Sequence, residues 1–253
     1  MSNLLTHTIE ERPDYPLLRI QLQPGQKVFA EPGSMVTMQG VQLRAGFAGG
    51  IKKAVGRVFS GESLVMNTYT SEGSGGEVTF APPALGDVQH VRIDGSTLML
   101  QRGAFLAHGE GIDMSASWGG ARGFFSGAGL VLLRVTGRGD LFFNSFGALI
   151  PMDVDGELIV DTGYVVGFDH TLDYQIRTMP TLRPGMWGKV KSFLMGGEGL
   201  VCHFNGRGRV WVQARQLSSW LSWVQPFRPV KQSNSGSSNS LAGSLTDLVS
   251  DSD

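Results

Sequence analysis

The sequence has one cysteine, almost no net charge and no long apolar run. Cys202 is the one cysteine among 253 residues, so no intramolecular disulfide can form. The longest apolar run, 127–133, is far shorter than the roughly 20 residues that a helix needs to span a bilayer. The segment 1–16 also has neither the basic region nor the apolar region of a secretory signal. These absences predict a protein of the reducing cytoplasm.

The charge balance is equally modest. The chain has 21 Lys and Arg residues against 22 Asp and Glu residues, which gives a formal net charge of -1. A value this close to zero excludes a global basic footprint for nucleic acid or for an anionic membrane. Hydrophobic residues make up 41% of the chain and charged residues 17%, so the composition predicts a folded core rather than global disorder.

Glycine, by contrast, is abundant, with 36 residues. Because glycine weakens helix interiors and favours turns with positive φ, this usage predicts many short strands. Three stretches can be laid over one another: 58–80, 124–143 and 194–212. In each, a Gly is followed three residues later by Leu, then by Val and an alternating strand. A glycine-rich segment comes next, which we interpret as a hairpin turn before a return strand.

A second set of matching glycines, Gly33, Gly103 and Gly163, precedes these stretches. The sequence therefore predicts an all-β fold of three pseudo-repeated antiparallel β-sheet units around a common core. The predicted single domain covers 1–230. Its parts are repeats at about 15–85, 86–145 and 146–215 and a short C-terminal helix at 216–225, followed by a flexible Ser/Asn-rich tail at 231–253.

The predicted helix has Leu217, Trp220, Leu221 and Val224 at helical spacing, and Pro226 ends it. We expect its tryptophans to cap the core. The tail begins with KQSNSGSSNS, which lacks apolar residues and is expected to be flexible. Its last segment has leucines at helical intervals, so docking on a partner is the alternative to disorder.

No arrangement of catalytic or metal-binding residues stands out. The five histidines lack the HxH and HExxH spacings of metal sites, and GFAGGIKK departs from a phosphate-binding loop. Cys202 and His203 are neighbours on a strand and point to opposite faces, so we expect a buried structural cysteine. The carboxylates of 151–161 are interpreted as a solvated turn. The sequence predicts no enzyme, no cofactor and no metal; an enzyme would need His108, His170 or His203 to meet a carboxylate in a pocket.

Three segments between the two sets of glycines mix basic residues with aromatic or apolar ones: 47–59, 118–125 and 187–193. If the units surround a pseudo-threefold axis, these insertions share one end of the domain. Such a surface could attract anionic lipid headgroups, RNA phosphates or an acidic partner. The alternative is that the aromatic residues plug the core while the basic groups are merely solvated. The candidate binding residues are Lys52, Lys53, Arg57, Trp118, Arg122, Trp187, Lys189 and Lys191.

The segments 14–36, 124–143 and 196–215 together resemble the bacterial and mitochondrial family called altered inheritance of mitochondria. The resemblance covers about 15–215, and its most specific part runs from Gly197 to Gln213. It implies a β-repeat fold like that of the tryptophan RNA-binding attenuation protein, related in shape to double-stranded β-helices. It also implies assembly into trimers or higher rings, an association of mitochondrial members with inner-membrane organisation, and no catalytic residues.

Together these patterns predict a non-enzymatic oligomeric scaffold or interaction protein of the cytoplasm, acting at the inner membrane surface. Its expected partners are further copies of the chain, as a trimer or hexamer, and other proteins or an anionic lipid surface. The alternative function is a module that binds RNA or small anions through the basic-aromatic insertions. A steep loss of binding with rising salt would favour that alternative.

Overall fold

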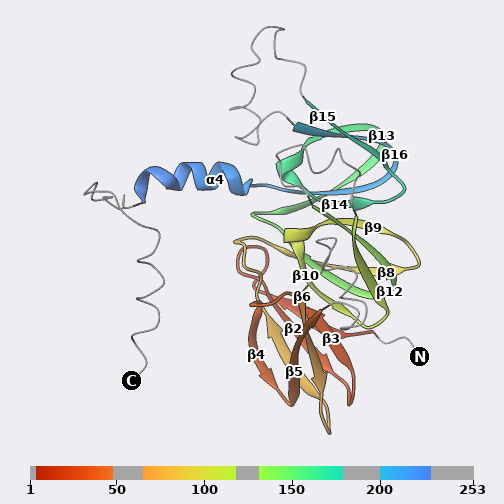
Figure 1. The fold of residues 1–253 in the computed structure, drawn as a ribbon, viewed down its shortest axis with the longest axis vertical. Coiled ribbons are helices and arrows are strands. Elements are labelled where there is room, and N and C mark those ends of the chain that lie inside the picture. The colour runs from red at the N-terminus through yellow and green to blue at the C-terminus, as the bar shows by residue number, and fades with distance from the viewer. Residues whose placement is uncertain (1–3, 48–64, 118–130, 179–199, 229–253) are drawn as a thin grey trace, which may run out of the picture. The chain divides into compact units, whose positions relative to one another are not determined.

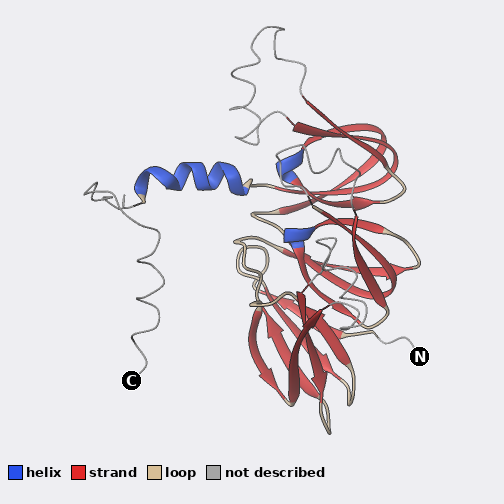
Figure 2. Cartoon of the chain, in the orientation of Figure 1, coloured by secondary structure: helices blue, strands red, loops and turns tan. Residues whose placement is uncertain are grey.

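The computed structural model describes residues 4–47, 65–117, 131–178 and 200–228 of the chain. Strands account for most of them, the strand ladders are antiparallel, and one α-helix, α4 (Leu217–Val224), lies near the C-terminal end (Figure 2). The predicted all-β class with a short C-terminal helix is therefore confirmed. Within these four ranges, no helix is long and apolar enough to cross a membrane.

The strands fall into three successive units, which Figure 1 shows in red to orange, yellow to green, and green to blue. After β1 (Thr6–Glu10), the first unit contains β2 (Leu17–Leu22), β3 (Lys27–Ala30), β4 (Met35–Gln39), β5 (Val41–Phe47), β6 (Val65–Ser71) and β7 (Gly76–Phe80). The second contains β8 (Val88–Asp94), β9 (Leu98–Gln101), β10 (Phe105–Gly109), β11 (Ile112–Ser117) and β12 (Leu132–Asn144). The third contains β13 (Leu149–Asp161), β14 (Val165–Asp169), β15 (Asp173–Thr178) and β16 (Leu200–Gln213).

Alternation of apolar and polar residues explains why these segments form sheets with one buried face. In β2 the side chains of Leu18, Ile20 and Leu22 are buried, while Arg19 and Gln21 face away from that core. The segment LLRIQL alternates apolar and polar residues, and one face is buried because successive side chains of a strand point to opposite faces. The residues of β7 pair with those of β2 in antiparallel register, and its Val78 and Phe80 are buried in the same core, but Thr79 between them is buried as well.

Two of the three predicted hairpin turns are wrong. Gly137 lies inside the continuous strand β12 and Gly206 inside β16, and both have positive φ. A single left-handed glycine in an extended run bends the strand without reversing it. The segment interpreted as a solvated turn, 151–161, is likewise part of β13, where Gly156 lies opposite Gly206. These three long strands therefore pass from one sheet layer into the next.

The bends divide the strands among four layers. Layer 1 is β1-β2-β7-β4, and layer 2 contains β8, the second half of β12, β10, β3, β6 and β5. Layer 3 contains the first half of β13, the second half of β16, β14, β9, the first half of β12, and β11. Layer 4 contains the second half of β13, the first half of β16, and β15. Each inner layer thus takes three strands from each of two successive units.

Buried apolar side chains gather in three clusters between these layers. The first and third clusters are each shared by two successive units, and the middle one contains residues of all three, such as Met66, Leu100 and Trp211. Examples from the two layers around each cluster are Ile20 and Leu106, Phe143 and Leu100, and Phe168 and Phe204. Among the described strands, ladders join the first unit to the second and the second to the third, and none joins the third to the first. The units follow one another in a row, unlike an arrangement around a pseudo-threefold axis. A triplicated origin of the chain stays a prediction.

The expected role of the helix tryptophans is not what the structure shows. Helix α4 contributes no buried residue, and Trp220 and Trp223 are 39% and 67% exposed. Trp220 makes an edge contact with Phe146, with ring centroids 5.9 Å apart. Trp223 is mostly in water, Trp220 is only partly covered, and the helix has no buried residue, so the expected cap formed by both tryptophans is not observed.

Candidate functional site

All eight candidate binding residues of the basic-aromatic insertions lie outside the described residues: Lys52, Lys53, Arg57, Trp118, Arg122, Trp187, Lys189 and Lys191. The structure does describe the strands on either side of each insertion. Each insertion connects two strands that pair antiparallel, at positions Phe47 and Val65, Ser117 and Leu132, and Thr178 and Leu200. The three insertions therefore occupy matching places in the three units. A shared basic surface stays a prediction.

Two histidines meet around a buried carboxylate near the N-terminal strand. His90 Nε2 lies 2.8 Å from Asp140 Oδ1, and the backbone N–H of Leu5 donates to Asp140 Oδ2 over 2.8 Å. The rings of His7 and His90 are 4.2 Å apart, and His7 also contacts Phe142. Burial opposes ionisation of Asp140, but the hydrogen bonds from His90 and Leu5 outweigh it and lower the pKa of this carboxyl. The cluster holds β1 against the second unit.

His108 lies apart from that cluster. It is buried in the second of the three cores, which lies between layers 2 and 3. Its ring stacks on Phe29 with centroids 4.9 Å apart, and Nδ1 donates to the carbonyl of Gly109 over 2.7 Å. Burial lowers the pKa of His108 to about 4, so the ring is neutral near pH 7. Its Nε2 has no hydrogen-bond partner within the described part of the chain.

The remaining residues singled out for chemistry have other surroundings. His203 lies 3.4 Å from Glu157, whose side chain is mostly exposed. Cys202 is fully buried, and burial raises the pKa of its thiol to about 12, which is unsuitable for a nucleophile. Across the ranges that the structure describes, no group of three or more His, Cys, Asp or Glu residues could hold a metal ion.

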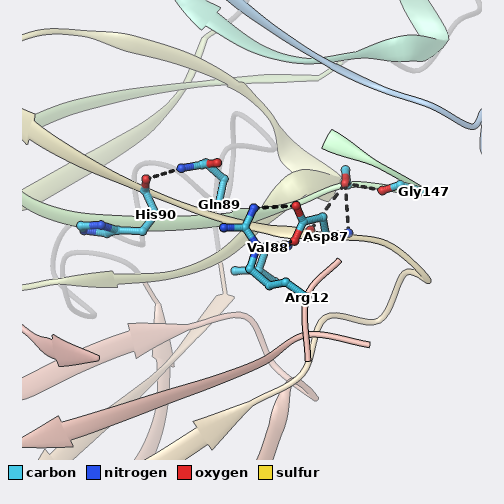
Figure 3. Close-up of polar contacts among 7 residues, drawn as sticks. Arg12, Asp87, Val88, Gln89, His90 and Gly147 are labelled. Carbon is cyan, nitrogen blue, oxygen red and sulfur yellow. Dashed lines mark hydrogen bonds and ion pairs between the residues drawn. The ribbon is translucent and has the colours of Figure 1, made fainter. Parts of the chain in front are cut away.

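An ion pair fixes the N-terminal segment to the start of the second unit (Figure 3). Arg12 donates from Nε and Nη2 to the two oxygens of Asp87, over 2.8 and 2.6 Å. The Asp87 carboxylate also accepts from the N–H of Val88, and the Asp87 N–H donates to the carbonyl of Gly147. This buried carboxylate is thus satisfied by both side-chain and backbone donors, which is a structural arrangement.

Neighbouring units are joined by one recurring strand pair. β3 of the first unit pairs with β10 of the second, and β9 of the second pairs with β14 of the third. His108 lies opposite Phe29 in the first junction, and Phe168 lies opposite Met99 in the second. His108 and Phe168 each follow their turn glycine by five residues, whereas Phe29 and Met99 precede one by four. Both junctions therefore have the same register.

The first unit contains the same kind of strand with no unit before it. In the described part of the chain, β4 pairs only with β7. Val36 and Met38, three and five residues after Gly33, are 51% and 43% exposed. Their counterparts in the second unit, Leu106 and His108, are buried. No described strand pairs with the other edge of β4, which explains the exposure of Val36 and Met38.

The third unit has the complementary deficiency. Among the described strands, the second half of β13 pairs only with β16. Ile159 precedes Gly163 by four residues and is 50% exposed, whereas its counterpart Met99 is buried at the second junction. Within the described ranges, this edge of layer 4 has no strand of the β4 type beside it.

The first half of β13 leads to the same conclusion. Ile150 and Met152 are 45% and 37% exposed. Ile150 pairs with Val212 and Met152 with Val210, in the segment GRVWV of β16. In the first unit, Leu18 and Ile20 pair with the residues at the same places of GEVTF in β7, Phe80 and Val78. Leu18 and Ile20 are fully buried, because layer 2 covers them with strands of the second unit. Nothing among the described residues gives Ile150 and Met152 a comparable cover.

Sequence reasoning missed these two surfaces. The alternation of Ile150, Met152 and Val154 marks a buried face, and Val36 with Met38 gives a similar signal on β4. Such a pattern shows that a face is apolar and not which chain covers it. The missing neighbours became visible only when strand pairing allowed the three units to be compared.

Comparisons with known proteins agree with this architecture. A family model described as mitochondrial biogenesis AIM24 matches residues 7–215. The chain is 29% identical over 244 residues to an uncharacterized protein of Streptococcus pyogenes serotype M6, covering 90% of this chain and 93% of that protein. The crystal structure of a Streptococcus pyogenes protein superposes with a TM-score of 0.71 at 27% identity, covering 88% of this chain and 100% of the crystallised one. Because the family model spans all three units, the chain belongs to the mitochondrial biogenesis AIM24 family.

Proposed function

We propose that this protein is a non-enzymatic scaffold that assembles head to tail, with β4 of one copy pairing with the second half of β13 of the next. The observation that carries the proposal is the exposure of apolar residues at the two ends of the row of units, at positions that are buried at the internal junctions. Burial of apolar surface is favourable by about 25 cal/mol per Å². A second copy would supply both the missing strand and the missing cover.

The internal junctions define the register of this contact. In the first junction, Ala107 lies opposite Ala30 and His108 lies opposite Phe29. The matching residues would place Met38 of one copy opposite Ile159 of the next. Layer 1 of one copy and layer 4 of the other would then form one sheet built like layers 2 and 3. Such a contact joins two different surfaces, so it leads to a closed ring or to a filament, and we expect a trimer or hexamer.

The residues with potential for catalysis support a scaffold rather than an enzyme. The thiol of Cys202 is protonated at neutral pH, and His108 is buried in the second core. His7 and His90 are engaged with Leu5 and Asp140, in contacts that hold β1. Each of these side chains has a packing or hydrogen-bonding role that explains its position.

We propose the surface of an anionic membrane as the place of action. Assembly would repeat the basic-aromatic insertions, and repeated weak contacts give a higher overall affinity. The test is flotation of the full chain with phosphatidylglycerol vesicles, comparing it with a variant in which Lys52, Lys53 and Arg57 are replaced by Ser. Loss of flotation in that variant is expected. Unchanged flotation would contradict membrane binding through these residues, and salt-sensitive binding of RNA instead would favour the alternative module.

Cysteine cross-linking tests the proposed contact. A Met38→Cys chain and an Ile159→Cys chain, mixed and oxidised, are expected to form a disulfide-linked dimer, whereas neither chain alone forms one. The natural Cys202 is buried and stays inert. Leu43→Cys is the comparison variant, because Leu43 is similarly exposed but lies on β5, which among the described strands pairs with neither β4 nor β13. Equal cross-linking by Leu43→Cys, or none by the mixed pair, would contradict the proposed register.

A further inference from the structure

We propose that Met38 and Met152 make the assembly sensitive to oxidation, because their sulfoxides keep free copies from joining. The inference rests on the proposed head-to-tail assembly. It adds a chemical modification to the surfaces that the assembly would bury.

The described methionines differ sharply in exposure. Met38 and Met152 are exposed, and they belong to the two surfaces that would join. Oxidation of methionine depends on access of the oxidant to the thioether sulfur. Among the methionines that the structure describes, these two side chains would therefore react first in free copies. The buried methionines of the internal cores are Met66, Met99 and Met114, and Met35 is partly buried.

The counterparts of the two exposed residues carry no sulfur. Met38 corresponds to His108 in the second unit and to Phe168 in the third. Met152, opposite Val210, corresponds to Ile20, which lies opposite Val78. The internal junctions hold these places with side chains that mild peroxide does not convert, and the neighbouring Met99 is buried.

The modification requires a peroxide as the oxidant. The thioether sulfur attacks one oxygen of hydrogen peroxide, the O–O bond breaks, a sulfur–oxygen bond forms, and water leaves. The sulfur loses two electrons and the peroxide gains them. A sulfoxide reductase reverses the step with two thiols, which become a disulfide while the oxygen leaves as water.

The sulfoxide is a strongly polar group at a place that assembly would make apolar. Met38 would face Ile159 of the next copy. Met152 would face Val36, because Ile20 and Leu106, their counterparts, share one core. Neither neighbour can donate a side-chain hydrogen bond to the new oxygen, so burying it is unfavourable. We expect each sulfoxide to raise the Kd of self-association by roughly tenfold to a hundredfold.

The experiment compares the full chain before and after treatment with dilute hydrogen peroxide at low protein concentration. Peptide mass spectrometry locates the sulfoxides, and sedimentation velocity gives the Kd. The variant Met38→Leu/Met152→Leu is compared with itself: its Kd, whatever its value before treatment, should not change after peroxide, because leucine has no sulfur to oxidise. Met114→Leu is the control and should remain sensitive. Treatment with a sulfoxide reductase and a dithiol should restore assembly of the oxidised natural chain.

Each other outcome has a distinct meaning. An untreated chain that stays monomeric would refute the proposed assembly itself. An oxidised chain with sulfoxides at Met38 and Met152 that assembles with an unchanged Kd would overturn this inference while leaving the assembly intact. Equal sensitivity of the Met38→Leu/Met152→Leu variant would also overturn it, because another methionine would then be responsible.

Discussion

Phe168 and Met38 occupy the same place in their units, five residues after a turn glycine, yet their surroundings differ. Phe168 is fully buried where β14 pairs with β9, whereas Met38 is 43% exposed on a β4 that lacks this neighbour. The corresponding edge residues Met99 and Ile159 show the same contrast. The internal junctions and the two ends of the row are thus built from matching strands with different neighbours.

This contrast teaches that burial is decided by the next unit rather than by the strand itself. Both MVTMQ in β4 and VVGFD in β14 carry apolar residues on their faces. An exposed sheet edge with apolar side chains is costly for a protein that stays monomeric, because it invites pairing with other strands. Variants that alter one member of each matching pair can therefore separate folding from assembly.

The largest expected effect comes from the internal junction. Phe168→Ala should lower the free energy of unfolding by about 3–5 kcal/mol, because it leaves a cavity in the third core. Met38→Ala should change the stability of the isolated chain by less than about 1 kcal/mol, since this side chain is already partly in water. Urea denaturation at low protein concentration measures both. Equal losses for the two variants would show that β4 is as well packed as β14.

At the ends of the row, the effect should fall on assembly alone. Ile159→Arg should weaken self-association by roughly a hundredfold or more, because the proposed contact would bury an unpaired charge. Its thermal unfolding should stay close to that of the natural chain. Leu43→Arg is the matched control, with an exposed leucine on a strand outside the contact. Sedimentation velocity should detect the difference; weakening of equal size by both variants would argue against a contact at β13.

A smaller, pH-dependent effect distinguishes the first junction from the second. Burial lowers the pKa of His108 to about 4, against 6.5 for an ordinary histidine. Below about pH 6.5 the unfolded chain binds a proton that the folded chain does not, so stability is lost as the pH falls toward 4. His108→Phe, which copies Phe168, should remove on the order of 2–3 kcal/mol of this loss. Urea midpoints at pH 7 and pH 4.5 test it, and an unchanged pH dependence in the variant would contradict it.

Local patterns predicted much of the fold. Alternation located β2, and the matching glycines Gly33, Gly103 and Gly163 marked corresponding turns. The bends at Gly137 and Gly206 could not be separated from hairpin turns, since both require positive φ at glycine. What differs is the path of the chain on either side, which depends on strands far away in the sequence.

The candidate site was less predictable than the fold. The sequence drew attention to the insertions around Lys52, Trp118 and Trp187, where unusual residue types stand out. Val36 and Ile159 are ordinary strand residues, and their exposure is unusual only in comparison with buried counterparts. That comparison requires the register of β3 with β10 and of β9 with β14, which no local pattern gives.

The smallest expected effect concerns the segment that crosses only the first junction. Arg12→Met should lower the free energy of unfolding by about 1–2 kcal/mol, because the Asp87 carboxylate is only 6% exposed and loses two of its charged donors. Arg207→Ala is the matched control: its pair with Asp155 is similarly short, 2.8 Å, but lies in water on both sides and should be worth less than about 0.5 kcal/mol. Self-association should be unchanged in both variants. If Arg12→Met weakened assembly instead, the N-terminal segment would belong to the contact between copies, and the division between internal junctions and chain ends would have to be redrawn.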